Sequence, residues 1–340
     1  MSARGGGSRG AGESPGRGGS PAGGGSLGAR LRDRDLAAAP AALNLLENRS
    51  PAVRADAAAL LAELSPARLG GEARGHVGGV TGPPGAGKST LLSALAAAWR
   101  TGGRTVAVLA VDPSSKRSGG ALLGDRARIE SDPADRGLFI RSTAAGERVG
   151  GLAPATRSAA QALAAAFDVV VIETVGVGQS ETDVADAADT VAVVVQPSSG
   201  DALQFLKSGI MEIPHVLVVT KADLGLVARR AERDLRAALR SLGASGTAVV
   251  SVSSVAPVRG LGELVAALDE HRAGLDVPAA RTRARRLGAL ADFVAEHGDR
   301  GLRALGGRRA AERWLAEQDA LLGGPELVRA LEGRAGIAGS

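Results

Sequence analysis

The chain contains no cysteine and no tyrosine, and aromatic residues make up only 2% of its 340 positions. The missing thiols exclude disulfides and thiolate metal sites, and they fit a reducing compartment. Because rings are so scarce, stacking platforms for single-stranded nucleic acid are scarce too, although the formal net charge is +5. We therefore expect no nucleic-acid partner.

Long apolar runs are also absent. No stretch approaches the roughly 18 residues that a membrane span needs, and the N-terminus lacks the apolar core of a secretion signal. We therefore expect a soluble, cytoplasmic protein without a membrane partner. The four histidines are scattered along the sequence: His76, His215, His271 and His297. We interpret each as an ordinary strand or surface residue rather than as a metal ligand.

The most informative segment is a complete phosphate-binding loop. It consists of Gly82, Pro83, Pro84, Gly85, Ala86, Gly87, Lys88 and Ser89, followed by Thr90. The loop lies between an apolar strand pattern, residues 77–81, and an Ala/Leu-rich helix pattern, residues 90–99. Its glycines let backbone N–H groups surround a polyphosphate, Lys88 places a charge on the β and γ phosphates, and Ser89 can ligate Mg²⁺. A turn that only joined strand to helix would not need this lysine and serine in register.

Composition divides the chain into four predicted parts. Residues 1–28 form a Gly/Ser/Pro/Arg-rich tail with little to bury, for which we predict disorder. Residues 29–72 form N-terminal helices, residues 73–275 form a nucleotide-binding domain, and residues 276–340 form a helical arm. The boundary at residue 73 follows from the start of the apolar runs, and the boundary at residue 276 follows from their end and the start of an arginine-rich segment.

Within the N-terminal part, apolar residues recur at helical spacing in two segments, residues 31–46 and 52–64. Ser50 and Pro51 are suited to begin the second helix as its cap and first residue. Pro40 should shorten or kink the first helix, because proline removes a backbone donor.

The central part shows seven apolar, β-branched runs separated by helical or loop segments. They cover residues 77–81, 105–111, 138–141, 169–173, 190–196, 216–220 and 248–253. Continuous apolar runs are typical of parallel strands covered on both faces. The sequence therefore predicts an α/β fold with a doubly wound, mostly parallel sheet, of the P-loop NTPase type.

The arm begins with four arginines: Arg281, Arg283, Arg285 and Arg286. Helix packing with a solvated basic face explains them better than nucleic-acid binding does. Phe293 and Trp314 are expected to be buried anchors of this helical part.

Carboxylates follow several strands, at the edge where ligands bind in open α/β sheets. Asp112 directly follows the second run, Asp125 lies on the loop after it, and Glu173 ends the fourth run. Together with Ser89 they are candidate magnesium ligands, since Mg²⁺ prefers hard oxygen ligands. Asp112 or Asp125 could instead cap a helix.

The segment after the fourth run is a candidate switch. Gly176 follows Glu173 by three residues, and a glycine there lets its N–H approach a terminal phosphate closely. Glu173 and Gln179 are the candidates for orienting the attacking water, with Lys88 as the third catalytic residue. A Gly-rich surface loop would explain the composition equally well on its own.

The base is indicated by Thr220, Lys221, Ala222 and Asp223. A carboxylate at 223 can accept both the N1–H and the N2–H of guanine, and the Lys221 stem can lie over the base. Thr220 stands where most GTPases have asparagine. A polar helix start is the alternative interpretation. Ser254, Val255 and Ala256 follow the last run, where backbone amides contact guanine O6 in such folds.

These motifs, in this order, closely resemble the MeaB/ArgK family, which includes the methylmalonic aciduria type A protein. The resemblance runs from about residue 36 to residue 268 and is most specific over residues 173–181. It implies a homodimeric GTPase of the SIMIBI class that uses GTP and Mg²⁺. Its implied role is that of a chaperone for an adenosylcobalamin-dependent acyl-CoA mutase, gating cofactor loading and protecting the mutase.

The resemblance also implies residue roles. Residues 82–90 would hold phosphates, and Asp223 with residues 254–256 would bind guanine. Residues 196–210, with Asp201, Gln204 and Lys207, would signal to the mutase. The arm matches the family's dimerisation arm only loosely. Two other functions stay open on the residues alone: a metal-insertion GTPase of related fold, which the absence of cysteine disfavours, and an ATP-binding transport or kinase component.

Overall fold

The structure is a computed structural model, and it describes residues 25–48, 50–112, 129, 132–144, 152–174, 184–197 and 214–337. Seven strands form one sheet within this part of the chain. They are β1 (His76–Thr81), β2 (Val106–Asp112), β3 (Leu138–Ala144), β4 (Val169–Thr174), β5 (Thr190–Val195), β6 (Val216–Val219) and β7 (Ala248–Ser251). Their order is β3-β2-β4-β1-β5-β6-β7, and every pairing is parallel. The predicted α/β fold is confirmed, and the sheet is wholly parallel in the described strands.

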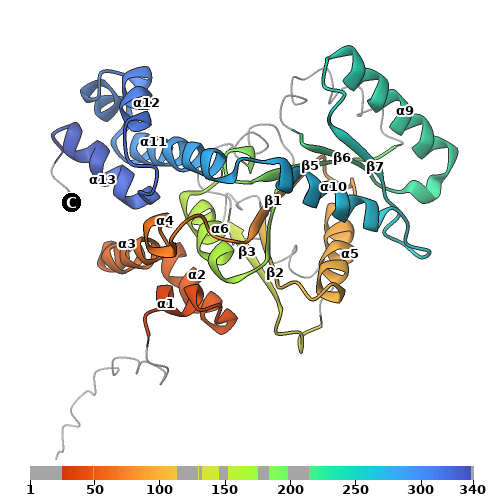
Figure 1. Ribbon diagram of the computed structural model, residues 1–340, viewed down its shortest axis with the longest axis horizontal. Helices are drawn as coiled ribbons and strands as arrows, with labels where there is room; N and C mark the ends of the chain where they lie inside the picture. Colours follow the sequence, from red (N-terminus) through yellow and green to blue (C-terminus); the bar gives the residue numbers. More distant parts are fainter. Residues whose placement is uncertain are drawn as a thin grey trace, which may run out of the picture.

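The helices of the N-terminal and central parts lie before, between and after the strands along the chain (Figure 1). They are α1 (Leu27–Arg32), η1 (Leu36–Ala38), α2 (Ala39–Glu47), η2 (Pro51–Val53), α3 (Arg54–Glu63), α4 (Pro66–Leu69), α5 (Lys88–Thr101), α6 (Pro154–Ala166), η5 (Ala222–Leu224), α9 (Leu226–Ser241) and α10 (Leu261–Gly274). The arm contains α11 (Val277–Ala304), α12 (Arg308–Ala316) and α13 (Gly324–Arg334).

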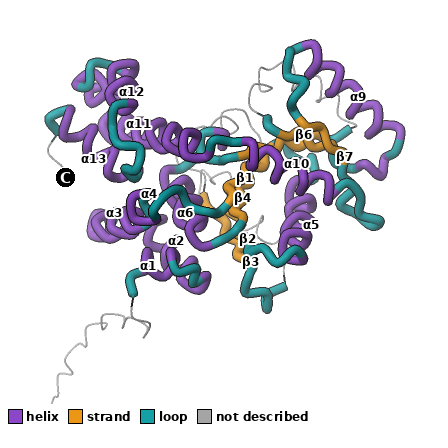
Figure 2. The backbone as a smooth tube through the Cα atoms, in the orientation of Figure 1, coloured by secondary structure: helices purple, strands orange, loops and turns teal. Residues whose placement is uncertain are grey.

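Strand β5 shows why the strands are apolar throughout. Val191, Val193 and Val195 pack into one core together with α6, α9 and the N-terminal helices. Ala192 and Val194 pack into the other core, with α5 and α10. Successive side chains of a strand point to opposite faces, so a strand covered on both faces needs no polar alternation. Figure 2 shows the sheet lying between these helices.

The N-terminal helices share the first of these cores instead of forming a separate one. Leu31, Leu43 and Leu60 belong to the same apolar cluster as strand residues of β1 and β4. The predicted tail was two residues too long, because α1 begins at Leu27 and Gly28 is buried against Glu63. The rest of the tail, residues 1–24, lies outside the described residues.

The first predicted helix, residues 31–46, is divided into α1, η1 and α2. The division falls at residues 33–35, and Pro40 lies in the first turn of α2, where a missing N–H costs nothing. The prediction that Pro40 would shorten or kink a continuous helix was therefore wrong about the position of the break. Pro51 begins η2, and α3 follows from Arg54.

The arm has an apolar core of its own. Phe293 is fully buried, and Leu290, Leu315 and Leu331 join it from the three helices of the arm. Trp314 packs against this core, with the guanidinium of Arg334 5.1 Å from its ring centre. Phe293 is thus the buried anchor that we expected, whereas Trp314 is only partly buried.

The arginine-rich start of α11 fastens the arm to the sheet. Arg281 donates to both oxygens of buried Asp189, at 2.8 and 2.6 Å, and to the carbonyl oxygens of Ala73 and Gly75. Arg285 pairs with Glu72 at 2.8 Å, and Arg286 donates to the Gln318 carbonyl. Three of the four arginines therefore have intramolecular partners, which favours helix packing, whereas the predicted solvated basic face is wrong for Arg281 and Arg285, whose side chains are 13% and 11% exposed. No helix of the described chain is long and apolar enough to cross a membrane.

Candidate nucleotide site

The phosphate loop joins β1 to α5 at the centre of the sheet. Gly82 has a φ of +144°, and a Cβ there would lie 2.1 Å from the Val194 carbonyl oxygen of neighbouring β5. Gly87 caps α5 with a φ of +88°, a conformation that side chains rarely adopt. The first N–H groups of a helix have no partner inside it and favour an anion. The loop therefore needs its glycines and directs a helix N-terminus at the ligand.

Lys88 is the first residue of α5 and is only 7% exposed. Its Nζ donates to the carbonyl oxygens of Gly82, at 2.7 Å, and Pro83, at 3.1 Å. These contacts hold the ammonium inside the curve of the loop. A cation in this position suits the β and γ phosphates of a nucleotide.

Ser89 and Glu173 meet from two different elements. The Ser89 hydroxyl, at the start of α5, donates to Oε1 of Glu173 at 3.1 Å. Glu173 is 5% exposed and lies near the carboxyl end of β4, beside β1. A hydroxyl and a carboxylate side by side are the donors that Mg²⁺ prefers, so this pair fits that ion.

Asp112 is the last residue of β2, and Val111 before it pairs with Thr174 of β4. Its backbone thus lies at the same edge of the sheet as Glu173. The other predicted residues of this side lie outside the described part of the chain. They are Asp125, Gly176, Gln179, Asp201, Gln204 and Lys207.

The predicted base-binding residues follow β6 and β7 at the same edge. Lys221 donates to the Gln196 side chain at 2.7 Å and lies 3.4 Å from the Gly85 carbonyl oxygen, so it reaches the phosphate loop. Asp223 is exposed, and its Oδ1 lies 3.4 Å from the Ser253 hydroxyl. A lysine against the loop and an accessible carboxylate beside it are the arrangement that base binding requires.

The loop with Ser254, Val255 and Ala256 is closed at its base. Ser253 and Arg259 exchange two backbone hydrogen bonds, at 3.0 and 3.1 Å. The Ser253 hydroxyl also lies 3.0 Å from the Val255 carbonyl oxygen. Since Ser253 approaches Asp223 as well, the structure brings this loop and Asp223 together.

Thr220 has a role that sequence reasoning missed. It is 3% exposed, and its hydroxyl lies 2.6 Å from the Ala86 carbonyl oxygen and 3.2 Å from that of Val195. The hydroxyl has one proton, so it donates to one carbonyl at a time, and Ala86 is the nearer acceptor. Thr220 thus braces the phosphate loop against the end of β6. The signal in the sequence was its position directly before Lys221.

Three histidines lie together at the amino ends of the strands, which we call the amino edge of the sheet. This arrangement corrects our interpretation of the four histidines as scattered residues. The Thr190 hydroxyl lies 2.9 Å from His76 Nε2 and 2.9 Å from His271 Nδ1. The His215 ring stacks on His271 with centroids 4.0 Å apart. Three of the four histidines are therefore neighbours, because β1, β5, β6 and α10 converge at this edge.

These histidines favour the neutral state. Burial lowers the pKa of His76 to about 4, and burial together with nearby His271 lowers the pKa of His215 to about 4. The Val191 N–H donates to His215 Nδ1 at 2.9 Å, so the neutral ring carries its proton on Nε2. Such a ring is a hydrogen-bonded structural residue.

Asp189 lies beside them as an anion. Burial opposes its ionisation, but the hydrogen bonds and charge of Arg281, together with the Val77 N–H and Arg272, outweigh burial and keep the pKa of Asp189 below its ordinary value. The amino edge therefore consists of groups that satisfy one another.

Comparison with known proteins agrees with this architecture. The family described as methylmalonyl-CoA mutase-associated GTPase MeaB matches residues 36–298. The chain belongs to the MeaB family. A GTPase of Pyrococcus horikoshii is 52% identical over 149 residues, which cover 44% of this chain and 47% of that protein. The mitochondrial methylmalonic aciduria type A homolog of Mus musculus is 41% identical over 170 residues, covering 48% and 40% of the two chains.

The match thus spans about half or less of the length of these two relatives. A crystal structure described as a LAO/AO transport system kinase superposes with a TM-score of 0.60 and 28% identity, covering 86% of this chain and 95% of that one. The predicted resemblance to the MeaB/ArgK family is confirmed.

Proposed function

We propose that this MeaB family member is a Mg²⁺-dependent GTPase. The observation that carries the proposal is the meeting of two motifs at one edge of the sheet. Lys221, from the base-binding motif, contacts the Gly85 carbonyl of the phosphate loop, and Asp223 lies two residues further on. A phosphate loop alone does not select a base, whereas a carboxylate in this position accepts two hydrogen bonds from guanine.

The residues of the site then have separate tasks. Residues 82–90 surround the phosphates, with Lys88 on the β and γ phosphates and Thr220 holding the loop in shape. Ser89 and Glu173, with Asp112 and Asp125, hold Mg²⁺, which neutralises charge on the phosphates when it is bound. Ser254, Val255 and Ala256 surround the guanine O6. Support comes from the Ser89 to Glu173 hydrogen bond and from the common edge of the strands.

Hydrolysis of GTP by water needs no covalent enzyme intermediate, because phosphoryl transfer depends on positioning and electrostatic stabilisation. We assign Glu173 or Gln179 to the orientation of the water and Gly176 to the detection of the γ-phosphate. Loss of that phosphate would release the segment after β4, which makes hydrolysis a conformational signal.

The receiver of this signal, we propose, is an adenosylcobalamin-dependent acyl-CoA mutase of the methylmalonyl-CoA mutase type. The chain would act as its chaperone, gating cofactor loading and protecting the mutase, in the cytoplasm and as a homodimer through its arm. The family description and the name of the mouse relative support the mutase. The separate core of the arm supports an independent docking unit.

Nucleotide preference tests the base assignment. The parent chain should bind GTP in preference to ATP. Asp223→Asn replaces an acceptor with a donor, so it should lose GTP and gain xanthosine triphosphate, whose base has a carbonyl where guanine has its amino group. Asp234→Asn, a change at another exposed aspartate, on α9, should keep the parent preference. ATP preference in the parent chain, as for a kinase, would overturn the proposal, and so would unchanged GTP binding by Asp223→Asn.

The partner has its own test. GTP hydrolysis should rise when a purified methylmalonyl-CoA mutase is added and should not rise with a cobalamin-independent acyl-CoA enzyme. Equal rates with both would contradict the chaperone role and leave the GTPase assignment standing.

A further inference from the structure

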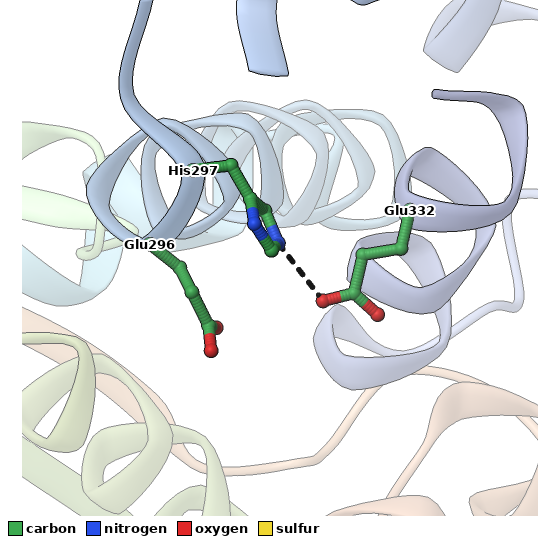
Figure 3. Close-up of side chains that lie close together, drawn as sticks. All are labelled: Glu296, His297 and Glu332. Carbon is green, nitrogen blue, oxygen red and sulfur yellow. Dashed lines mark hydrogen bonds and ion pairs between the residues drawn. The ribbon is translucent and has the colours of Figure 1, made fainter. Parts of the chain in front are cut away.

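Three potential metal ligands meet in the arm, between α11 and α13. Glu296 and His297 lie on α11, directly before its interruption at Gly298, and Glu332 lies on α13. One ligand atom from each residue lies within 4.8 Å of the other two. Figure 3 shows that the three side chains border one space between the helices. Thirty-five positions of sequence separate His297 from Glu332, so only the fold brings them together.

The surroundings hold these side chains in place. Gly298, with a φ of 60° and a ψ of −159°, interrupts α11 directly after His297. The His297 ring lies 4.8 Å from that of Phe293, the buried centre of the arm core. The side chains of His297 and Glu332 are only 14% and 16% exposed. Much of the entropy cost of ordering two of the three ligands is therefore already met by folding.

The hydrogen bonds of the cluster leave it suitable for a cation. His297 Nε2 lies 3.1 Å from Glu332 Oε1, so the proton between them occupies the position that a metal ion would take. Arg54, from α3, donates to Oε1 of Glu296 at 2.9 Å. A carboxylate has two oxygens, so Arg54 can keep Oε1 and orient the group while Oε2 ligates.

Charge points to the same conclusion. The carboxylates of Glu296 and Glu332 bring two negative charges, and Arg54, which pairs with Glu296, brings one positive charge, so these three groups sum to −1. One nitrogen and two carboxylate ligands suit Zn²⁺ and its transition-metal neighbours better than Mg²⁺, which prefers oxygen and water. We propose that Glu296, His297 and Glu332 form a binding site for a zinc-class dication that clamps α11 to α13.

The required movement is small. Ligand bonds of about 2.0–2.2 Å place tetrahedral ligand atoms about 3.4 Å apart. The three atoms must therefore approach one another by at most about 1.4 Å, which rotation about glutamate side-chain bonds can supply. Water completes the fourth position, as in zinc sites with three protein ligands.

Metal binding to the whole chain, without a histidine tag, tests this proposal. The protein is stripped with a chelator, saturated with Mg·GDP to fill the nucleotide site, and titrated with Zn²⁺. We expect one Zn²⁺ per chain, a higher thermal midpoint with Zn²⁺, and an absorption spectrum of tetrahedral Co²⁺ when Co²⁺ replaces it. Because the ligands must be deprotonated, affinity should fall as the pH is lowered.

Variants identify the ligands. His297→Gln keeps a donor for Glu332 but removes the imidazole, and Glu332→Gln removes a carboxylate. Each should weaken Zn²⁺ binding by at least the roughly 10- to 100-fold that loss of a group bonded to a metal ligand costs. Glu312→Gln is the matched control, because it removes a carboxylate from an exposed pair with Arg308 in the same arm. It should bind Zn²⁺ like the parent.

Two outcomes would overturn the site. One is the absence of stoichiometric Zn²⁺ on the parent chain. The other is equal affinity in the parent, His297→Gln and Glu332→Gln, which would place the ion elsewhere. If one variant fails to fold without metal, the other variant and the Co²⁺ spectrum of the parent still decide. GTP hydrolysis enters none of these measurements.

Discussion

At the carboxyl edge of the sheet, Lys88 and Thr220 hydrogen-bond to carbonyls of a loop that leads to exposed Pro84 and Gly85. At the amino edge, Asp189 is enclosed by Arg281 and Arg272, and the Thr190 hydroxyl lies between His76 and His271. Both edges gather polar side chains on the same strands. The first presents a helix N-terminus and an accessible carboxylate to a ligand, whereas the second satisfies its charges internally. Clustering of polar residues is thus a poor guide to function until their partners are known.

Loss of a buried charge at the amino edge should have the largest effect on the stability of the fold. Asp189→Asn leaves Arg281 and Arg272 without their buried counter-ion, and we expect a loss of about 3–5 kcal/mol in the free energy of unfolding. Urea denaturation measures it. The control is Asp269→Asn, which breaks the more exposed pair with Arg104 and should cost no more than about 1 kcal/mol. Equal losses in both variants would remove the distinction between the edges.

At the carboxyl edge, loss of a charge should instead reduce the rate of GTP hydrolysis. Lys88→Ala removes the cation that faces the phosphates, and we expect kcat/KM for GTP to fall roughly 100- to 1000-fold, as for loss of one group that stabilises a transition state. Its unfolding free energy should change much less than that of Asp189→Asn, since water reaches the neighbouring loop. A Lys88→Ala enzyme as active as the parent would contradict the assignment of this edge.

Low pH should lower the free energy of unfolding through the histidines of the amino edge. The folded pKa of His215, about 4, lies below its ordinary 6.5, so the unfolded chain takes up the proton first. This contribution to stability is complete above pH 6.5 and is lost as the pH falls from 6.5 to about 4. Nearby Asp189, whose pKa is also lowered, acts in the same direction at lower pH.

His215→Asn isolates this effect, because the asparagine oxygen can still accept the Val191 N–H. The stability difference between parent and variant should vary with pH by no more than about 1.4 kcal/mol per pH unit, the value for one proton. Denaturation at pH 4.5, 5.5 and 7 tests it. A difference independent of pH would show that His215 does not titrate as inferred.

Thr220 should give the smallest effect. Thr220→Val keeps the shape but leaves the Ala86 carbonyl without its hydroxyl partner, at a cost of about 1 kcal/mol. We expect a similar loss in GTP affinity, several-fold, because the loop is braced less firmly. Thr220→Ser retains the hydroxyl and should behave like the parent in both measurements. Failure of serine to do so would assign the effect to packing of the methyl group.

The sequence alone gave correct strands and a correct fold class, because parallel strands covered on both faces must be apolar at every position, as in β5. It also placed the phosphate loop, since Gly82 and Gly87 adopt backbone conformations that residues with side chains rarely adopt. These are local requirements, and a local pattern records them.

Other features depended on residues far apart in the chain. The histidines looked scattered, yet β1, β5, β6 and α10 bring three of them together. In the sequence, Thr220 is notable only for standing where most GTPases have asparagine, whereas its distance of 2.6 Å to the Ala86 carbonyl oxygen makes it a brace. The arginines of residues 281–286 looked like a basic surface until their partners, Asp189 and Glu72, were seen.

The sequence by itself therefore determined the class of ligand and the positions of the strands along the chain, because a phosphate loop and apolar runs are encoded by adjacent residues. The tertiary structure alone decided which charges are paired and which groups meet in the arm, as Glu296, His297 and Glu332 do. The physical reason is that burial and ion pairing depend on distances in space, and the register of strands and the packing of helices set those distances.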